Sequence, residues 1–287
     1  MSGQLRTLKN RIRSVGNTKK ITHAMEMVAA AKLRRFQDTM VRARPFTRGL
    51  ENLLNRLNSA QLAKTHPFFE AREEKQVALV LITSDTGLCG SYNNELIHAA
   101  LRFLHEHHEK NPRLIGVGKM GINHLKRLGY KPHTTFVDTR ASRIDEILTG
   151  LRTTIEALFL EKRADAIYVI YSRFLTVSKY EKTLEKLLPL GKTQKESFEE
   201  TEYIFEPSEE TIFKKLIPLY FEARVRMIFL ESFVSEQIAR MTAMHQATDN
   251  AEEMIDSLVL QRNKARQAAI TKELIEIISG SRALKIK

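Results

Sequence analysis

Hydrophobic residues recur at helical spacing near the N-terminus of this 287-residue chain. Over residues 4–58, apolar side chains return every three or four positions, as they do on one face of an α-helix. Pro45 should kink or interrupt this helix, because proline removes a backbone donor and clashes with the preceding turn. The predicted apolar stripe consists of Leu5, Leu8, Ile12, Val15, Ile21, Met25, Val28, Leu33, Phe36 and Met40.

The C-terminal segment predicts a second and longer helix. Residues 219–279 contain neither Gly nor Pro, and as a helix they would extend about 90 Å. Gly280 is expected to end the helix. So narrow an apolar stripe on so long a helix needs a coiled-coil partner. We expect the N-terminal helix of the same chain, lying antiparallel, with pairing between two copies as the alternative. The stripe consists of Met227, Leu230, Val234, Met241, Met244, Ala251, Ile255, Leu258, Ala265 and Ala269.

Between the two helices the pattern alternates between strands and helices. Residues 77–82 are an unbroken apolar run, which is typical of a buried parallel strand. Alternation of this kind favours a parallel sheet flanked by helices. Residues 176–206 are polar and irregular, with a short strand expected at Tyr203–Phe205. The other expected strands are 114–117, 134–137 and 166–171, and the expected helices are 94–109, 120–128 and 144–160.

The predicted fold class is therefore an α/β domain, with a Rossmann-like parallel-rich sheet, inserted between two long terminal helices that form an antiparallel coiled coil. The domain boundaries follow these elements. We place an N-terminal coiled-coil helix at 1–58, a linker at 59–75, the α/β domain at 76–207 and a C-terminal coiled-coil helix at 208–287.

Composition narrows the class of protein. A hydrophobic content of 43% excludes wholesale disorder. A single cysteine excludes an intramolecular disulfide framework and fits a reducing compartment. No segment approaches the run of about 20 apolar residues that crosses a bilayer, and no apolar core of a secretory signal follows the early charges. We expect a mature, soluble, intracellular protein.

The net charge of +12 is concentrated at the N-terminus. Residues 1–58 hold 13 basic and three acidic side chains, whereas residues 59–207 and 208–287 each carry a net charge of only +1. A basic segment of this kind fits a polyanionic partner, which could be nucleic acid, an acidic membrane surface or an acidic protein surface. The alternative is an ordinary solvated helix face.

One motif suggests a dinucleotide site. Residues 116–121, Gly-Val-Gly-Lys-Met-Gly, satisfy G-x-G-x-x-G between a strand and a helix, and Asp138 follows seventeen residues after the last glycine. Such glycines place a pyrophosphate on a helix N-terminus. However, the motif follows the second expected strand rather than the first, and no substrate domain accompanies it. Glycines that permit a tight turn explain it better.

Other candidate sites are incomplete. Gly191-Lys-Thr193 lacks the earlier glycine of a phosphate loop, because Lys186 stands in that place. The His105–His108 cluster lacks the H-E-x-x-H spacing of a zinc helix and fits a partly solvated helix end. Cys89 has no evident base and fits a packed loop residue. The residues therefore predict no catalytic residue, no metal site and no cofactor.

Four segments, which make up three family motifs, resemble the γ subunit of F-type ATP synthases, the central rotor stalk, in its bacterial form. Residues 21–32 (ITHAMEMVAAAK) resemble that family's N-terminal helix, and the loop at residues 84–90 (SDTGLCG) resembles the motif after its first strand. Residues 241–250 (MTAMHQATDN) and 263–274 (NKARQAAITKEL) resemble its closing signature. The matches lie in the family's order and cover essentially the full length.

The resemblance implies a non-catalytic rotor subunit of a proton-translocating ATP synthase complex, on the cytoplasmic face of a bacterial inner membrane. The coiled coil would turn inside a ring of three α and three β subunits, whose β subunits carry the catalytic sites. The α/β domain would meet the ε subunit and the membrane-embedded c-ring, which would provide the only membrane association. Nucleic acid is not among the implied partners.

The resemblance also implies contact residues. Met25, Arg240, Arg266, Gln267 and Thr271 match positions that contact the α/β ring, with an ordinary helix position as the alternative for each. A weaker match places Tyr203 and Glu206 toward the c-ring and ε. The sequence departs from the family pattern at Thr86, where Arg is usual, at Ser91, which replaces a glycine, and at Glu95, so details of that loop differ.

Two other functions compete with the rotor. A coiled-coil nucleic-acid-binding protein would use the basic N-terminal helix, but a basic-region reader concentrates its cations outside the zipper, and here they are interleaved with apolar positions. A dinucleotide-binding oxidoreductase would use residues 116–121.

Overall fold

The computed structural model describes residues 2–57, 66–139, 143–176, 179–191 and 205–285. The chain divides into two compact units. The helical unit comprises Met1–Ala29 and Met241–Lys287, and the α/β unit comprises Ala30–Arg240. Each long helix is divided between the two units, whereas the predicted domains keep each helix whole. The domain boundaries at 58, 75 and 207 therefore stay a prediction.

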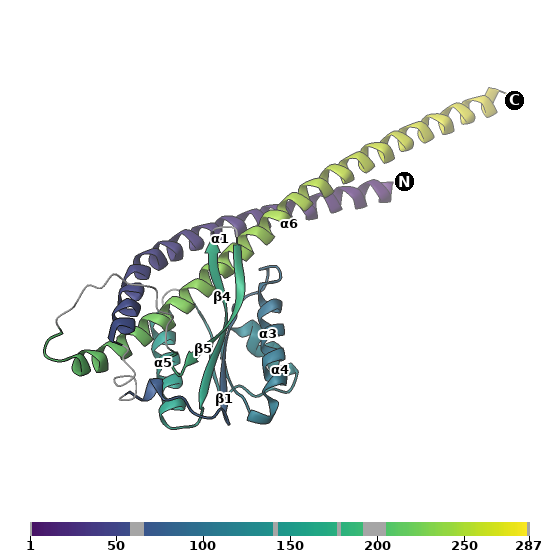
Figure 1. Cartoon of the computed structure of the whole chain (residues 1–287). Helices are drawn as coiled ribbons and strands as arrows, with labels where there is room; N and C mark the ends of the chain where they lie inside the picture. Colours follow the sequence, from purple (N-terminus) through teal and green to yellow (C-terminus); the bar gives the residue numbers. More distant parts are fainter. Residues whose placement is uncertain (1, 58–65, 140–142, 177–178, 192–204, 286–287) are drawn as a thin grey trace. The chain divides into compact units, whose positions relative to one another are not determined.

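Two long helices run through the chain, as predicted. Helix α1 spans Ser2–Leu57 and helix α6 spans Glu209–Lys285. Helix α1 continues through Pro45, so the expected interruption does not occur, although Figure 1 shows α1 curving along its blue part. The expected stop at Gly280 is wrong, because α6 runs on to Lys285. One glycine costs a helix only about 1 kcal/mol, and the residues after it favour a helix.

The α/β unit is built on a five-stranded sheet with the order β3-β2-β1-β4-β5. Its strands β1 (Val77–Ile82), β2 (Arg113–Val117), β3 (Thr134–Phe136) and β4 (Ala166–Thr176) are parallel to one another. Helices α3 (Tyr92–Glu106) and α4 (Lys119–Arg127) lie on one side of the sheet and α5 (Ile144–Leu160) on the other (Figure 1). Short 3₁₀ turns occur at Pro67–Phe69 and His108–Lys110. The predicted alternation of strands and helices is confirmed.

One strand was not predicted. Residues expected to be irregular form β5 (Lys179–Leu188), which pairs antiparallel with β4. Strand β5 is an edge strand, and only its last two residues, Leu187 and Leu188, are fully buried. Edge strands tolerate charged residues, so its sequence lacks the apolar run that marks β1. In the expected strand at Tyr203–Phe205, Tyr203 lies outside the described residues, and Phe205 is not in a strand.

The core of the α/β unit joins the sheet to α3 and α6. All six residues of β1 are buried, and Leu96, Phe103 and Ala239 pack in the same cluster as Leu79 and Leu81. Nearer the start of α6, the Phe221 ring lies 5.1 Å from the ring of Phe68. The first part of α6 therefore belongs to the core of this unit.

Candidate functional site

In the helical unit, α1 and α6 lie side by side and antiparallel (Figure 1). Lys19 Nζ lies 2.8 Å from Glu252 Oε1, and Glu26 Oε1 lies 3.0 Å from His245 Nδ1. As residue numbers rise along α1 they fall along α6, which confirms the predicted antiparallel coiled coil within one chain. All ten predicted stripe residues of α6 are buried or half-buried.

The inner face of α1 differs from the prediction at two positions. Ile21 and Val28, which were expected in the stripe, are 60% and 55% exposed. Thr22 and Ala29 are buried in their place, and the Thr248 hydroxyl donates to Thr22 Oγ1 at 2.8 Å. Two apolar side chains thus face outward, and beside Ile21 two hydroxyl groups meet inside.

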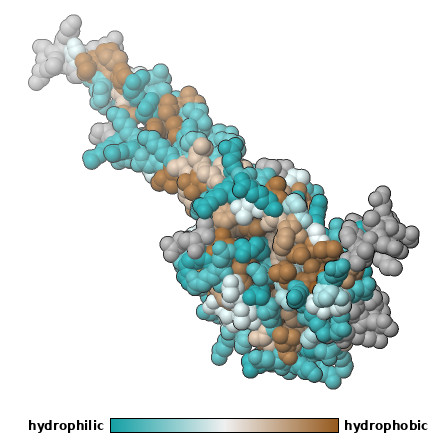
Figure 2. All heavy atoms as spheres, turned by 90° about the vertical axis from the view of Figure 1, so that its left-hand side faces the viewer, coloured by the Kyte–Doolittle hydropathy of each residue, from teal (hydrophilic) through white to brown (hydrophobic). Residues whose placement is uncertain are grey.

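The far end of α6 leaves its apolar side chains exposed. The helices are antiparallel and Lys19 lies opposite Glu252, so the start of α1 lies opposite the region of Ala269. Ala269 is the last buried residue in the described part of α6. Beyond it, large apolar side chains are 50–67% exposed, and Figure 2 shows brown, hydrophobic atoms next to the grey end of the chain. These side chains, together called the apolar tip, are Ile270, Leu274, Ile275, Ile277 and Ile278.

The outer surface of α1 is basic. Asp38 is the single exposed acidic residue in the described part of this helix, whereas ten cationic side chains are exposed. A helix face with so uneven a charge attracts an acidic surface. The ten cations are Arg6, Lys9, Arg11, Arg13, Lys20, Lys32, Arg34, Arg35, Arg42 and Arg48.

The predicted contact residues differ in their exposure. Arg266, Gln267 and Thr271 are exposed on α6, as contact residues must be. Met25 is half-buried on α1. In the weaker pair, Glu206 is exposed, and Tyr203 lies outside the described residues.

Arg240 stands apart because it is buried within its own unit. Its guanidinium lies 2.6 Å from Glu236 Oε1 and donates to Thr86 Oγ1 at 3.0 Å. Burial raises the pKa of Glu236, and the ion pair with Arg240 opposes that shift. Arg240 therefore ties α6 to the loop that follows β1, in which Leu88 is exposed.

Cys89 lies in the same loop and is buried. Burial raises the pKa of its thiol, while nearby donors oppose the shift. The amide of Asn93 donates to the sulfur at 3.1 Å. A neutral buried thiol is a poor nucleophile, so Cys89 is a packing residue, as predicted.

The glycine motif at 116–121 is used for packing. Gly118 has φ +87°, and a Cβ there would lie 2.0 Å from the Thr83 carbonyl oxygen. The first amides of α4 are also occupied, because Lys119 N donates to Asp85 and Gly121 N donates to Thr83 Oγ1, each at 3.0 Å. A pyrophosphate would need these same amides.

The crevice in which a doubly wound sheet binds its ligand is also filled. Such ligands lie at the carboxyl ends of the strands, where the strand order reverses, and here that point falls between β1 and β4. Helix α6 supplies Phe229, Ser232 and Glu236 to this place, and about 10 Å³ of free space remains. The Tyr92 hydroxyl contacts Ser232 Oγ at 2.8 Å. The site geometry therefore argues against the oxidoreductase.

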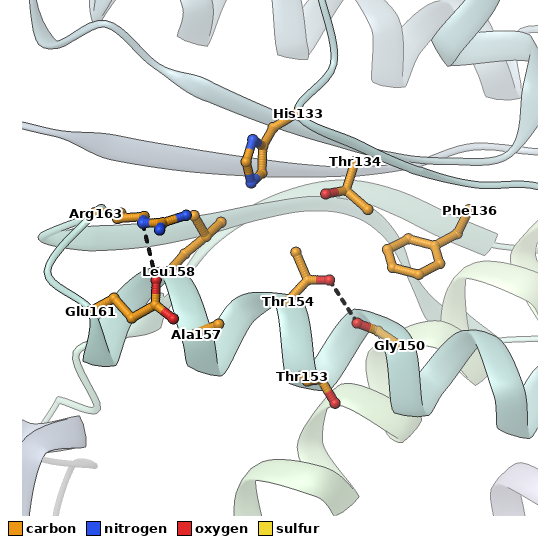
Figure 3. Close-up of a pocket in the computed structure, with 10 residues that line it drawn as sticks. All are labelled: His133, Thr134, Phe136, Gly150, Thr153, Thr154, Ala157, Leu158, Glu161 and Arg163. Carbon is orange, nitrogen blue, oxygen red and sulfur yellow. Dashed lines mark hydrogen bonds and ion pairs between the residues drawn. The ribbon is translucent and has the colours of Figure 1, made fainter.

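A groove of about 580 Å³ lies between β3 and α5 (Figure 3). Phe136 packs against Gly150 at one end, and Arg163 lies with its partner Glu161 at the other, where Nε and Oε2 are 3.0 Å apart. His133 on its upper wall is exposed. Because Arg163 is already paired with Glu161 and the Thr154 hydroxyl donates to the Gly150 carbonyl, the groove offers a ligand little specific recognition.

Three further candidates concern metals, phosphate and the membrane. Among the described residues, no three His, Cys, Asp or Glu side chains gather as metal ligands, and His105 and His108 are exposed at the end of α3. Lys192 and Thr193 of the incomplete phosphate loop lie outside the described residues. None of the described helices combines the length and apolar character needed to cross a bilayer.

Sequence reasoning missed the apolar tip and the outward position of Ile21 and Val28. A signal for the tip was present in the sequence, because its closely spaced apolar residues spread over a wider arc of the helix than one stripe occupies. These residues are Leu274, Ile275, Ile277 and Ile278.

Known proteins resemble the chain over nearly its whole length. The family described as ATP synthase matches residues 4–284. The chain is 42% identical over 284 residues to the ATP synthase gamma chain of Moorella thermoacetica, covering 98% of this chain and 99% of that one. It is 39% identical over 282 residues to the ATP synthase gamma chain of Desulforamulus reducens, with 98% and 99% covered.

Solved structures share the fold. A chain of the Euglena gracilis mitochondrial ATP synthase, OSCP/F1/c-ring, matches with a TM-score of 0.70 at 18% identity, covering 99% of this chain and 95% of that one. A chain of the Tetrahymena thermophila mitochondrial ATP synthase, central stalk/c-ring, matches with a TM-score of 0.61 at 24% identity, covering 79% and 99%.

Proposed function

Because the chain belongs to the ATP synthase gamma-chain family, we propose that it is the central rotor shaft of an F-type ATP synthase. It couples ion flow through the membrane c-ring to conformational change at catalytic sites on the β subunits. The chain itself is non-catalytic and needs no cofactor, in line with the filled crevice and the occupied α4 amides.

The observation that carries this proposal is the apolar tip. An exposed helix end with large apolar side chains over a wide arc would be poorly solvated in water. A ring of partner subunits that surrounds the helix removes these side chains from water. Because such contacts are non-directional, the helix can turn inside the ring without binding one neighbour too tightly.

The basic surface of α1 suggests that the lining of the same ring is acidic. We propose three α and three β subunits around the paired helices, and the ε subunit and the c-ring against the α/β unit. Membrane association through the c-ring alone would place the chain on the cytoplasmic face of a bacterial inner membrane. Two helices of unlike surface present a different face to each β subunit, so nucleotide affinity at each site depends on the shaft angle, and nucleotide occupancy biases that angle in return.

Individual residues take different parts in this proposal. Arg266, Gln267 and Thr271 are exposed and available for polar contacts with the α/β ring, and Met25 would contribute an apolar contact. The buried position of Arg240 favours positioning of the loop after β1 over a direct contact. Glu206 and Tyr203 are proposed for the side that meets the c-ring and ε.

Co-purification tests the proposal. We expect α, β and ε subunits to be retained by the tagged chain. Replacing Ile275 and Ile278 by Ser should lower retention of α and β about tenfold or more, because two large side chains lose burial in the complex. The melting temperature of the isolated variant should not change, because both side chains are exposed there.

Glu276→Gln is the matched control, because Glu276 lies on the same turns and is also exposed. It should leave retention unchanged. If the unaltered chain retains no α or β subunits, the rotor function is wrong. If the unaltered chain retains α and β subunits and the double serine variant retains them equally well, the apolar tip is not the surface that contacts the ring.

A further inference from the structure

Five charged side chains meet where α1, α6 and the β4–β5 hairpin come together in the α/β unit. Arg44 comes from α1, Arg173 from β4, Glu185 from β5, and Arg224 and Glu231 from α6. We call this group the charge cluster. None of the five side chains is fully exposed, so these charges are shielded from water in part.

Glu185 is the centre of the cluster. Its carboxylate accepts from Arg224 Nη2 at 2.5 Å, from the Tyr171 hydroxyl at 3.1 Å and from Arg173 Nη2 at 3.4 Å. Burial works against the charge on Arg224, but the Glu185 carboxylate outweighs it and raises the pKa of that guanidinium. One carboxylate thus connects the hairpin to α6 by a charge-assisted hydrogen bond.

Glu231 connects α6 to α1. Its Oε1 lies 4.0 Å from Arg44 Nη2. Burial raises the pKa of Glu231, and Arg224, Arg44 and Arg173 oppose that shift, while Glu185 adds to it. The three elements are therefore joined by charges of alternating sign.

The cluster lies on one line along α6. Residues seven and eleven positions after Arg224 return to nearly the same side of a helix with 3.6 residues per turn. Those residues are Glu231 and Ser235, and the Ser235 hydroxyl donates to the Ser172 carbonyl of β4 at 3.2 Å. Helix α6 therefore faces the hairpin with a polar line, although its neighbouring positions, such as Phe221 and Phe229, are apolar.

Charges and apolar contacts respond differently to rotation of a helix. Apolar side chains exchange one neighbour for another at small cost, because the hydrophobic effect has no direction. A half-buried charge that leaves its partner loses a compensation that water replaces only in part. A turn of α6 by one residue, about 100°, would take Arg224 away from Glu185 and Ser235 away from Ser172 together.

We propose that the charge cluster fixes the rotational register of α1 and α6 on the sheet within the α/β unit, and so passes torque between the sheet and these two helices without slip. This inference rests on the proposed rotor function. Glu185 and Arg224 are positioning residues in this scheme, since they act by holding α6 to the hairpin.

The test measures torsional stiffness in the assembled enzyme. The α and β ring is fixed to a surface and stalled with a non-hydrolysable ATP analogue, and a bead is attached to the α/β unit of this chain. The thermal spread of the bead angle then reports the twist between the sheet and the two helices. We expect Glu185→Gln to raise the angular variance about twofold or more, because it removes the charge but keeps the side-chain shape. Arg224→Gln combined with Glu185→Gln should add little, because both remove one interaction.

Glu210→Gln is the control, because it removes an exposed ion pair with Lys214 on the same helix, and it should leave the variance unchanged. Unchanged variance in Glu185→Gln would overturn the proposal. If that variant does not assemble, Arg224→Lys keeps the charge but loses the guanidinium fork. In that case, an angular variance in Arg224→Lys equal to that of the unaltered chain would overturn the proposal. Failure of the rotor function is seen separately, as an unaltered chain whose bead does not turn on addition of ATP.

Discussion

Gly118 occupies a backbone position that admits no side chain. Its φ of +87° disfavours an L-residue, and a Cβ would lie 2.0 Å from the Thr83 carbonyl oxygen. Gly129 has nearly the same φ, +89°, but no atom within 4 Å of its Cβ position. The two glycines therefore separate the cost of the conformation from the cost of the clash.

We expect Gly129→Ala to lower the free energy of unfolding by about 1–2 kcal/mol, the cost of a left-handed L-residue. Gly118→Ala should cost at least about 2 kcal/mol more, because backbone must move to relieve the clash. Urea unfolding of the full chain, followed by circular dichroism, measures both. Equal shifts for the two variants would show that the turn between β2 and α4 is looser than the structure indicates.

Cys89 offers a second measurement on one residue. Because burial raises the pKa of its thiol and shields it, we expect a maleimide reagent at about pH 7.5 to label the folded chain at least about tenfold more slowly than the urea-unfolded chain. Ser84→Ala, which removes a hydroxyl 3.9 Å from the sulfur, should leave labelling slow, because burial is the main cause. Rapid labelling of the folded chain would contradict the buried position.

Among the elements, both long helices could be predicted from the sequence. Which residues of α1 face α6 could be predicted only in part. The predicted stripe on α6 is confirmed, because its ten apolar residues keep a heptad-like spacing over many turns. On α1 the apolar residues Ile21 and Val28 face outward, because Thr22 and Ala29 are smaller and allow α6 to approach. Periodicity favours the most apolar face, whereas close packing of two helices favours small residues.

The account of α6 as a continuous transmission element predicts the effect of a kink. Ala251 is buried in the contact with α1, and Ala251→Pro would remove a helical hydrogen bond at a local cost of about 3 kcal/mol. We expect impaired proton-coupled ATP synthesis in membrane vesicles, while the α/β unit keeps its own cooperative melting transition.

Glu209→Pro introduces the same residue at the first position of α6, where proline is tolerated, and should leave synthesis unchanged. Normal synthesis by the Ala251→Pro enzyme, with the variant chain verified in the complex, would show that α6 is not the transmission element.

At the scale of the whole molecule, the sequence predicts the α/β architecture but not what fills its crevice. Strand β1 is recognisable because all six of its residues are apolar and buried, whereas β5 is charged because it forms an edge. The insertion of Ser232 and Glu236 of α6 at the ends of β1 and β4 depends on contacts between residues about 140 positions apart in sequence. No local pattern marks such contacts, so the loss of the ligand crevice became visible only in the structure.

Rotation of this chain inside the assembled enzyme tests the central claim most directly. With the α and β ring fixed to a surface and a bead on the α/β unit, addition of ATP should turn the bead in one direction, with pauses at each third of a turn, because the shaft meets three equivalent β subunits in succession. Hydrolysis of ATP at the full rate while the bead stays still would contradict the account.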